Sequence, residues 1–323
     1  MTRPRSRPLL ALLALLAAAV VAVGCGSSDN GGSSSSSGGG GSSSASADQP
    51  GKGKPAITIG TKDFTEEFVL GELYARALKA KGYKVNLKRN IGATEIVDKA
   101  LTSKQIDAYP EYTGVALAVT FGKNVLTKSA EDTAQRVKKL YQDRGQLVSD
   151  ATPFQDVDAI AATKAFAQKN NLQAVPDLKK LPSFTIGARP EFKSRFTGLK
   201  GMQDVYKIDN AKFKQLALGL QYQALDKGDV DTANVFSTDA QLASGKYQLL
   251  KDPKGIFGYQ NVYFVINKDK YDALGGQQFM DVINKVNSIL TGKAMQTMNA
   301  AVDLDKKEAG DVAQAYLQAN NMA

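Results

Sequence analysis

From about residue 56 onward, short runs of β-branched residues alternate along the chain with longer amphipathic stretches. Ala56–Gly60 is an expected strand, and the stretch after it has apolar residues at helical spacing. Thr65 is placed to cap this helix, and Gly82 follows its end, where a left-handed C-cap is common. This alternation favours parallel strands joined by crossover helices, which is an α/β fold.

The pattern predicts two series of such elements. The first continues with strands at Tyr83–Lys88 and Ile106–Tyr109, and with helices at Thr94–Ser103 and near residues 112–121 and 130–143. The second has strands at Val157–Ala162, Phe184–Gly187, Lys212–Leu216 and Val230–Phe236 and a helix at Gly219–Lys227. A strand at Val262–Asn267 precedes a helical C-terminal part. The stretch from about Ala56 to Ala323 is long enough for two domains with a large core.

The first 24 residues have the features of an export signal. Three arginines precede an apolar run that ends at Val23 and is short for a bilayer span. Small residues directly before Cys25 are typical of a bacterial lipoprotein processing site, after which Cys25 carries the lipid. The alternative is an ordinary secretory signal that contains a cysteine. Either way, residues 1–24 are excluded from the fold.

Residues 25–55 follow as an expected flexible linker, because they are mostly serine and glycine with almost nothing apolar to bury. Such a tether behind a lipidated Cys25 keeps the folded part at the outer face of a membrane without fixing its orientation.

Composition excludes several classes of function. The net charge of +9 falls to +6 once the three arginines of the signal are removed, and this mild excess is interspersed, so nucleic-acid binding is not indicated. The chain has no histidine and one cysteine. A Ser-His-Asp triad, a Cys/His pair, a histidine-rich zinc site and an internal disulfide are therefore all excluded, and no phosphate-binding loop, cofactor or metal is expected.

Three motifs carry a more specific signal. They are the stretch Ile57-Thr-Ile-Gly-Thr-Lys-Asp-Phe-Thr-Glu-Glu, the turn Asn90-Ile-Gly-Ala-Thr, and the stretch Asp107-Ala-Tyr-Pro-Glu-Tyr-Thr-Gly. In order and spacing they resemble the IGSKxFTEQ, GGT and DIYPEYTGT motifs of the substrate-binding proteins of glycine betaine/choline (quaternary ammonium) ABC importers. The later stretches Gln221-Tyr-Gln-Ala-Leu and Phe236-Ser-Thr-Asp add to this resemblance, which runs from about Ile57 to near the C-terminus.

The resemblance implies a two-lobe periplasmic-binding-protein-like fold of type II, with a mostly parallel sheet in each lobe and a cleft between the lobes. Lobe 1 is then residues 56–157 plus 260–323, and lobe 2 is residues 158–259. The implied function is that of a lipid-anchored, extracytoplasmic receptor that delivers a small cationic or zwitterionic solute to an ABC permease with its ATPase. The receptor is expected to be a monomer. It performs no chemistry.

The chemistry of a quaternary ammonium ion explains why this family relies on aromatic residues. The ion has no N–H to donate, so its diffuse charge is held by aromatic faces, each contributing about 0.5–2 kcal/mol. Three faces give about 2–6 kcal/mol, whereas micromolar binding needs about 8. Closure of two lobes supplies further contacts and removes water.

By resemblance, Tyr112 and Tyr259 are expected walls of an aromatic cage, and Phe236 stands where a third tyrosine is usual. The main departure is Asp158, which occupies the place of a fourth aromatic residue. Its carboxylate could pair with the ligand's cation or accept hydrogen bonds from ligand N–H groups, so specificity for trimethylammonium stays open.

For the carboxylate end of a betaine, the resemblance assigns Lys62 and Arg195. A hydroxyl usual in the family is replaced by Val115, so one contact to the ligand carboxylate is missing unless Thr94, Thr113 or Thr238 supplies it.

The same residues also have plain structural explanations. These are core packing for the three aromatic residues, solvation at the surface for Lys62 and Arg195, and a strand-edge or capping role for Asp158. Two other functions stay open as well: a secreted hydrolase or transferase that uses carboxylates such as Asp107 and Glu111, and a ligand-sensing or adhesion lipoprotein with a degenerate cleft.

Overall fold

The computed structural model describes residues 49–322. The expected signal sequence, Cys25 and most of the expected linker therefore lie outside the described residues. Between residues 49 and 322 no helix is long and apolar enough to cross a membrane. In the same range no group of three acidic side chains is placed to hold a metal ion.

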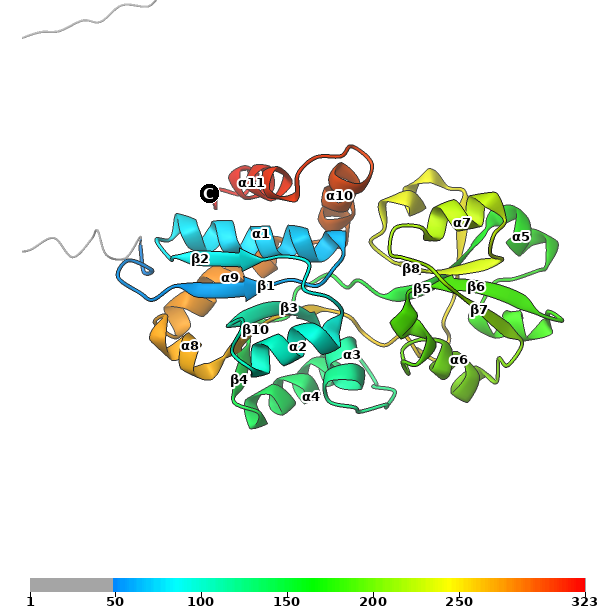
Figure 1. The fold of residues 1–323 in the computed structure, drawn as a ribbon, viewed down its shortest axis with the longest axis horizontal. Coiled ribbons are helices and arrows are strands. Elements are labelled where there is room, and N and C mark those ends of the chain that lie inside the picture. Colours follow the sequence, from blue (N-terminus) through cyan, green and yellow to red (C-terminus); the bar gives the residue numbers. More distant parts are fainter. Residues whose placement is uncertain (1–48, 323) are drawn as a thin grey trace, which may run out of the picture. The chain divides into compact units, whose positions relative to one another are not determined.

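The first of two five-stranded sheets has the order β2-β1-β3-β10-β4, and we call the part of the chain that carries it lobe 1 (Figure 1). Its strands are β1 (Ile57–Gly60), β2 (Val85–Lys88), β3 (Ala108–Tyr112), β4 (Gln146–Val148) and β10 (Val262–Asn267). β1 is parallel to β2 and β3, whereas β10 is antiparallel to β3 and β4. Two segments far apart in sequence therefore share one sheet.

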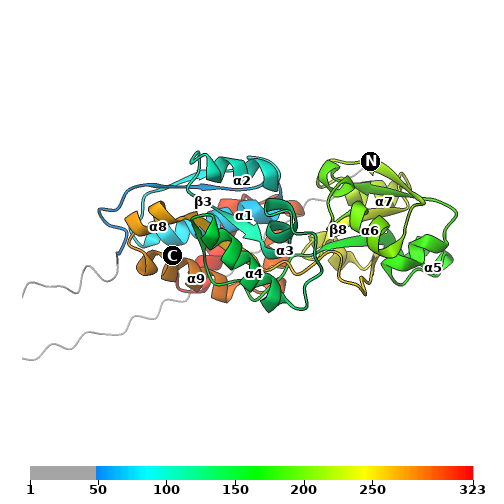
Figure 2. The same cartoon turned by 90° about the horizontal axis from the view of Figure 1, so that it is seen from below.

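Helices cover both faces of this sheet (Figures 1 and 2). They are α1 (Thr65–Ala80), α2 (Thr94–Thr102), α3 (Thr113–Val115), α4 (Ala130–Asp143), α8 (Lys268–Ala273), α9 (Gln277–Ile289), α10 (Gly292–Asp303) and α11 (Ala309–Ala319). The apolar sides of α1, α9, α10 and α11 form the core on one face, and those of α2 and α4 pack on the other. A π-helical turn at Ala116–Thr120 continues α3.

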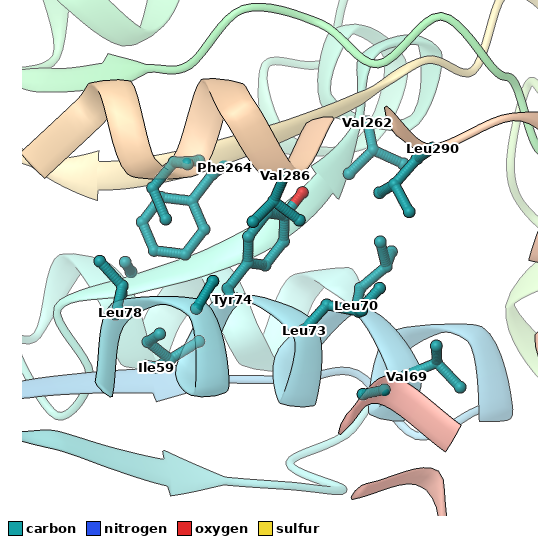
Figure 3. Close-up of a cluster of buried hydrophobic side chains, with 14 of the residues drawn as sticks. Ile59, Val69, Leu70, Leu73, Tyr74, Leu78, Val262, Phe264, Val286 and Leu290 are labelled. Atoms are coloured by element: carbon teal, nitrogen blue, oxygen red, sulfur yellow. The ribbon is translucent and has the colours of Figure 1, made fainter. Parts of the chain in front are cut away.

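The core under α1 shows how the helical spacing is used. Leu70, Leu73 and Tyr74 on α1 face β10 and α9, and all three are fully buried (Figure 3). The Tyr74 ring packs edge-on against Phe264, with ring centroids 5.0 Å apart, and its hydroxyl donates to Asn287 Oδ1 at 2.6 Å. This bond satisfies the one polar atom that the ring carries into the core.

The second sheet has the order β7-β6-β8-β5-β9, and we call the part of the chain from β5 to β9 lobe 2. Its strands are β5 (Asp158–Thr163), β6 (Phe184–Ala188), β7 (Ala211–Gln215), β8 (Thr232–Phe236) and β9 (Tyr247–Leu250). Its helices are α5 (Lys164–Lys169), α6 (Leu199–Tyr206) and α7 (Gln221–Lys227), with 3₁₀ turns at Val175–Lys180, Pro190–Lys193 and Ala240–Ser244. α5 and α6 pack on one face and α7 on the other.

The expected two-lobe α/β architecture is confirmed, with one difference in the sheets. Each is mixed rather than mostly parallel, because the strand that enters from the other lobe (β10 or β5) runs antiparallel to its neighbours. The two crossing segments lie beside each other, and Gln155 and Asn261 form an antiparallel bridge between them.

Three local expectations differ from the structure. The N-cap of α1 is Phe64 rather than Thr65, because the Thr65 hydroxyl instead donates to Asp303 Oδ1 at 2.6 Å. Residues 49–55, assigned to the linker, pack on the lobe: Gly51 donates its N–H to Lys81 at 3.0 Å, and a Cβ at Gly51 would lie 2.3 Å from the backbone of Tyr83. Finally, β4 and β9 were not predicted, because three or four residues give too short a pattern. Gly82, with φ of +82°, follows α1 as predicted.

Candidate ligand-binding site

A cavity of about 50 Å³ is lined by residues of both lobes. Its lobe 1 residues come from the loop after β1, the start of α2 and the end of β3, and its lobe 2 residues come from β5, the turn after β6 and the end of β8. The lining residues are Lys62, Asp63, Phe64, Ala93, Thr94, Tyr112, Val115, Asp156, Asp158, Arg189, Glu191, Arg195, Leu218, Phe236 and Gln260. Six of the residues that the sequence analysis named as candidates thus meet here: Lys62, Thr94, Tyr112, Asp158, Arg195 and Phe236.

Three aromatic rings form a stack in this cavity. The ring of Phe64 lies between those of Tyr112 and Phe236, with centroid distances of 6.0 Å and 5.4 Å and interplanar angles of 28° and 16°. Tyr112 ends β3 of lobe 1 and Phe236 ends β8 of lobe 2, so the stack joins the two lobes. Phe64 was not predicted as a site residue, although it stands two positions after Lys62 in the first motif.

Each outer ring of the stack also carries a cation of the protein. Lys62 Nζ lies 4.5 Å from the centroid of the Tyr112 ring, and the guanidinium carbon of Arg189 lies 5.0 Å from that of Phe236. Both distances fall within the range of cation–π attraction. The aromatic faces are therefore suited to cations, and in this conformation they are partly used by the protein's own.

The Arg189 cation is paired with Asp158, the residue that replaces an aromatic one. Arg189 Nη1 and Nη2 donate to Asp158 Oδ1 and Oδ2 at 2.7 Å and 2.9 Å, and Asn234 Nδ2 donates to Oδ1 at 2.8 Å. Both carboxylate oxygens are thus occupied by the protein, and the pair is buried. A ligand cation could pair with Asp158 only if the bidentate pair between Arg189 and Asp158 were broken. Pairing of Asp158 with the ligand therefore stays a prediction.

Arg189 itself was missed, although a charged residue directly after the buried strand β6 was a readable signal. Ligands of open α/β sheets bind at the carboxyl ends of the strands, which is where Arg189 stands.

Lys62 is held by buried carboxylates rather than left free for a ligand. Its ammonium bonds to Glu111 and lies 3.9 Å from Glu67 Oε1, while its backbone N–H donates to Glu67 Oε2 at 3.0 Å. Burial raises the pKa of Glu67 to about 8, although the Lys62 charge opposes this rise. Glu111 also accepts from the backbone N–H of Tyr112 at 2.6 Å and so fixes the last residue of β3.

Glu66 links the two lobes from the first turn of α1. Its carboxylate accepts from the Tyr112 hydroxyl at 2.9 Å, from Thr238 Oγ1 of lobe 2 at 2.6 Å, and from Asn299 Nδ2 at 3.0 Å. Burial raises the pKa of Glu66, and the three donors oppose the rise. Thr238 was predicted to contact the ligand. In the structure its hydroxyl donates to Glu66, and Thr238 is not among the residues that line the cavity.

Asp156 lies on the segment that crosses into lobe 2, and it accepts from the backbone N–H of Thr238 at 3.1 Å. Burial, with the nearby Glu66 charge, holds its pKa well above the usual range.

Arg195 makes an ion pair across the interlobe cavity. Its Nη2 donates to Glu95 Oε2 of lobe 1 at 2.8 Å, and its Nε to Oε1 at 3.3 Å. The Arg195 side chain is 9% exposed, whereas that of Glu95 is 51% exposed. Bonds and charge from Arg195 lower the pKa of Glu95 against the opposing effect of partial burial. Because Glu95 is exposed, it is a partner that solvent can replace.

Thr113 and Tyr259 are not among the lining residues of the cavity. Thr113 Oγ1 donates to the carbonyl of Tyr259 at 2.8 Å, and the Tyr259 hydroxyl donates to the Lys128 carbonyl at 3.4 Å. Tyr259 lines a separate small hollow beside Gly114 and Leu117. Its neighbour Gln260 reaches the cavity instead.

Gly114 makes this packing possible. A Cβ there would lie 2.7 Å from Gln260 Nε2 and 2.8 Å from the Tyr259 carbonyl oxygen. The glycine of the third motif therefore serves the close approach of the second crossing segment.

Comparisons with known proteins find relatives over most of the chain. A "Glycine-betaine-binding protein" of Pseudomonas aeruginosa is 29% identical over 280 residues, which are 82% of this chain and 88% of the relative. The "Ergothioneine transport permease/ergothioneine binding protein EgtU" of Helicobacter pylori is 28% identical over 273 residues, 82% of this chain, but the match spans only 47% of that protein.

Among solved structures, one described as "Crystal structure of glycine betaine/carnitine/choline ABC transporter" matches with a TM-score of 0.67 at 22% identity. It covers 83% of this chain and 99% of that one. This likeness concerns the fold, which it places among two-lobe binding proteins.

One family model, "Substrate binding domain of ABC-type glycine betaine transport system", matches residues 55–319. The resemblance read from the motifs is thereby confirmed, as is the expectation that the protein binds a solute outside the cytoplasm for a transport system and catalyses no reaction. The chain belongs to the family of substrate-binding domains of ABC-type glycine betaine transport systems.

Proposed function

We propose that the protein captures a quaternary-ammonium or related zwitterionic osmolyte, of the glycine betaine, choline or carnitine type, between its lobes and delivers it to an ABC permease. The family membership and the printed names of the relatives support this class of solute. Because such solutes lack an N–H group at the onium centre, the rings in the cavity are the groups that would recognise it.

The observation that carries the proposal is the position of Phe64 between Tyr112 and Phe236. In our proposal the Phe64 ring fills the slot of the onium group while no ligand is bound, and the ligand replaces it. The cavity of about 50 Å³ agrees with this, since it would hold a few water molecules and no whole osmolyte. Withdrawal of one ring frees the space between two aromatic walls.

Arg195 is the better candidate for the carboxylate of a betaine. Its partner Glu95 is half exposed, so the exchange of Glu95 for a ligand carboxylate has a small cost. Lys62 is held by the buried Glu111 and Glu67, and its release would leave them unpaired. We therefore assign the carboxylate to Arg195 and an electrostatic role at the Tyr112 ring to Lys62.

The lobes are proposed to move about the crossing segments, with divisions between residues 157 and 158 and between residues 259 and 260. The bridge between Gln155 and Asn261 supports a hinge at this place. A ligand that contacts both lobes only when they are closed shifts the population toward the closed state. We also propose that the protein is a monomer held at the membrane by a lipid on Cys25, with residues 26–48 as its tether.

Calorimetric titration with choline and with glycine betaine tests the proposal. Tyr112→Ala and Phe236→Ala should each weaken binding of both solutes at least tenfold, because each removes one wall. Phe166→Ala, which removes a half-buried ring of lobe 2 outside the cavity, is the matched control and should leave affinity within about twofold. Unchanged affinity in both wall variants would exclude the aromatic slot.

A further inference from the structure

A second cavity, of about 310 Å³, adjoins the first between α1, α7, α10 and the end of β8. The two cavities share the lining residues Asp63, Phe64, Asp156, Leu218 and Phe236. A ligand that displaces Phe64 therefore has access to both. The volume lies at the lower end of the range of small-molecule sites.

The lining of this second cavity, which we call the acceptor chamber, is rich in hydrogen-bond acceptors. It includes five carboxylates: Asp63, Glu66, Asp156, Asp239 and Asp303. The one cation in the lining is Lys306, which is exposed and donates its Nζ protons to the carbonyl of Asp303. Five carboxyl groups thus face one cation, and burial raises the pKa of three of them: Glu66, Asp156 and Asp239. A cation bound among them would favour their ionised forms.

Two buried amides of the chamber add an observation that is independent of charge. Gln221 and Asn299 are 5% and 4% exposed, and the amide oxygen of each has no hydrogen-bond partner among the described residues. The orientation of Asn299 is set by Glu66, to which its Nδ2 donates at 3.0 Å. A buried acceptor without a donor costs about 1–3 kcal/mol, so a ligand that brings donors to this place gains that energy.

The chemistry of the missing donor follows from this set of acceptors. A quaternary ammonium ion brings no hydrogen-bond donor, whereas a primary ammonium brings three N–H groups and a guanidinium five. Both also carry the positive charge that the carboxylates favour. Burial raises the pKa of Asp239 to about 6, and a bound cation would favour its ionised form.

We propose that the acceptor chamber binds an N–H-bearing cationic head, an ammonium or guanidinium group, of a solute whose other end lies between Tyr112 and Phe236. This inference rests on the proposed function, because it extends the same interlobe site. It adds to the solutes of the proposed function those onium compounds that also carry an amine or guanidine.

Matched ligands test it on the full-length protein by isothermal titration calorimetry. Aminoalkyl-trimethylammonium ions with two to five methylene groups are compared with the hydroxyalkyl ions of the same lengths, of which choline is the shortest. At the length that reaches the chamber, the amine should bind at least tenfold more tightly than the alcohol. Equal affinities at every length would overturn the inference and leave the proposed function intact.

Variants of the chamber provide the second readout. Gln221→Leu and Asp303→Asn should each reduce the preference for the amine over the alcohol at least fivefold. Gln223→Leu, an exposed glutamine on the same helix, should leave the preference unchanged. Two chamber variants are used so that a failure of one to fold, monitored by circular dichroism, does not remove the test. A preference that persists in a folded chamber variant would count against the inference.

Failure of the proposed function gives a different result. If no trimethylammonium compound binds, agmatine, which has an amine and a guanidine but no onium, becomes the probe. Agmatine binding that weakens at least fivefold in Gln221→Leu would support the chamber on its own, and no agmatine binding would overturn it.

Discussion

The two lobes place the same kind of constellation at the same position of their sheets. In each, an aromatic residue ends the central strand (Tyr112 on β3, Phe236 on β8), and a cation from the loop after a neighbouring strand lies over its ring. In lobe 2 the Arg189 cation and the Asp158 carboxylate form a balanced, bidentate pair. In lobe 1 the single Lys62 is surrounded by Glu67 and Glu111, with Glu66 nearby.

This difference indicates that the lobes have different tasks. The lobe 2 constellation is electrostatically complete, so it presents Phe236 as a rigid wall. Lobe 1 has an excess of buried carboxyl groups. Burial raises the pKa of Glu66 and of Glu67, and an added cation would favour their ionised forms. The Tyr112 ring of lobe 1 is also held by the hydrogen bond that its hydroxyl donates to Glu66. The same carboxylate accepts a hydrogen bond from Thr238 of lobe 2. We therefore propose that lobe 1 supplies the attraction for the ligand cation, with Glu66 as its link to lobe 2.

Removal of the carboxylate that pairs with Arg189, compared with removal of the one that pairs with Lys62, should give the largest difference, and it should appear in the free energy of unfolding. Asp158→Asn leaves the buried Arg189 without a counter-charge, and should lower the free energy of unfolding by about 3–5 kcal/mol in urea titrations. Glu111→Gln should cost less, because Glu67 remains 3.9 Å from Lys62. A larger loss for Glu111→Gln than for Asp158→Asn would contradict the contrast between the lobes.

The excess of carboxylates in lobe 1 predicts a pH dependence of stability. Burial raises the pKa of Glu67 to about 8 from an unfolded value of about 4.5, so the native state binds this proton more tightly than the unfolded state. Stability from this group is present below pH 4.5 and is lost as the pH rises from there through 8. The expected loss is a few kcal/mol.

Glu67→Gln should flatten this dependence and make the protein more stable than wild type at pH 8, as measured by urea titration at pH 5 and 8. Asp158→Asn, which alters lobe 2, serves as the control and should keep the wild-type slope. An unchanged slope in Glu67→Gln would show that Glu67 does not hold a proton in the folded state.

Removal of the Phe64 ring from between Tyr112 and Phe236 should have the smallest effect, and it should strengthen ligand binding rather than weaken it. Phe64→Ala removes a ring that competes with the ligand through stacking on Tyr112 and Phe236, each aromatic pair being worth about 0.5–1.5 kcal/mol. Affinity for choline should therefore rise about three- to tenfold in calorimetry. A tenfold loss of affinity in Phe64→Ala would instead show that the Phe64 ring contacts the bound ligand together with Tyr112 and Phe236.

The sequence predicted the strand end on which Phe236 stands, and its third motif marked Tyr112 as a ring that faces a ligand. The predicted strand before Tyr112 ended at Tyr109, whereas β3 continues to Tyr112. The sequence did not predict the partners of the charges. Asp158 and Arg189 are 31 positions apart and meet only because β5 and β6 flank β8 in one sheet. Phe64 was overlooked because whether a partly buried loop ring points into a cavity depends on the position of the opposite lobe.

Tyr259 illustrates the same limit. A turn motif placed a tyrosine near the cleft, yet Gly258, with φ of +70°, directs the chain so that Gln260 faces the cavity instead. Local sequence thus predicts where a backbone segment passes, and a shift of one residue decides which side chain lines the cavity.

A crystal structure of the protein with bound choline tests the central claim most directly. The account predicts the onium nitrogen within about 6 Å of the ring centroids of both Tyr112 and Phe236, with the Phe64 ring moved out of the stack. Choline bound elsewhere, or bound while Phe64 still lies between those two rings, would contradict it.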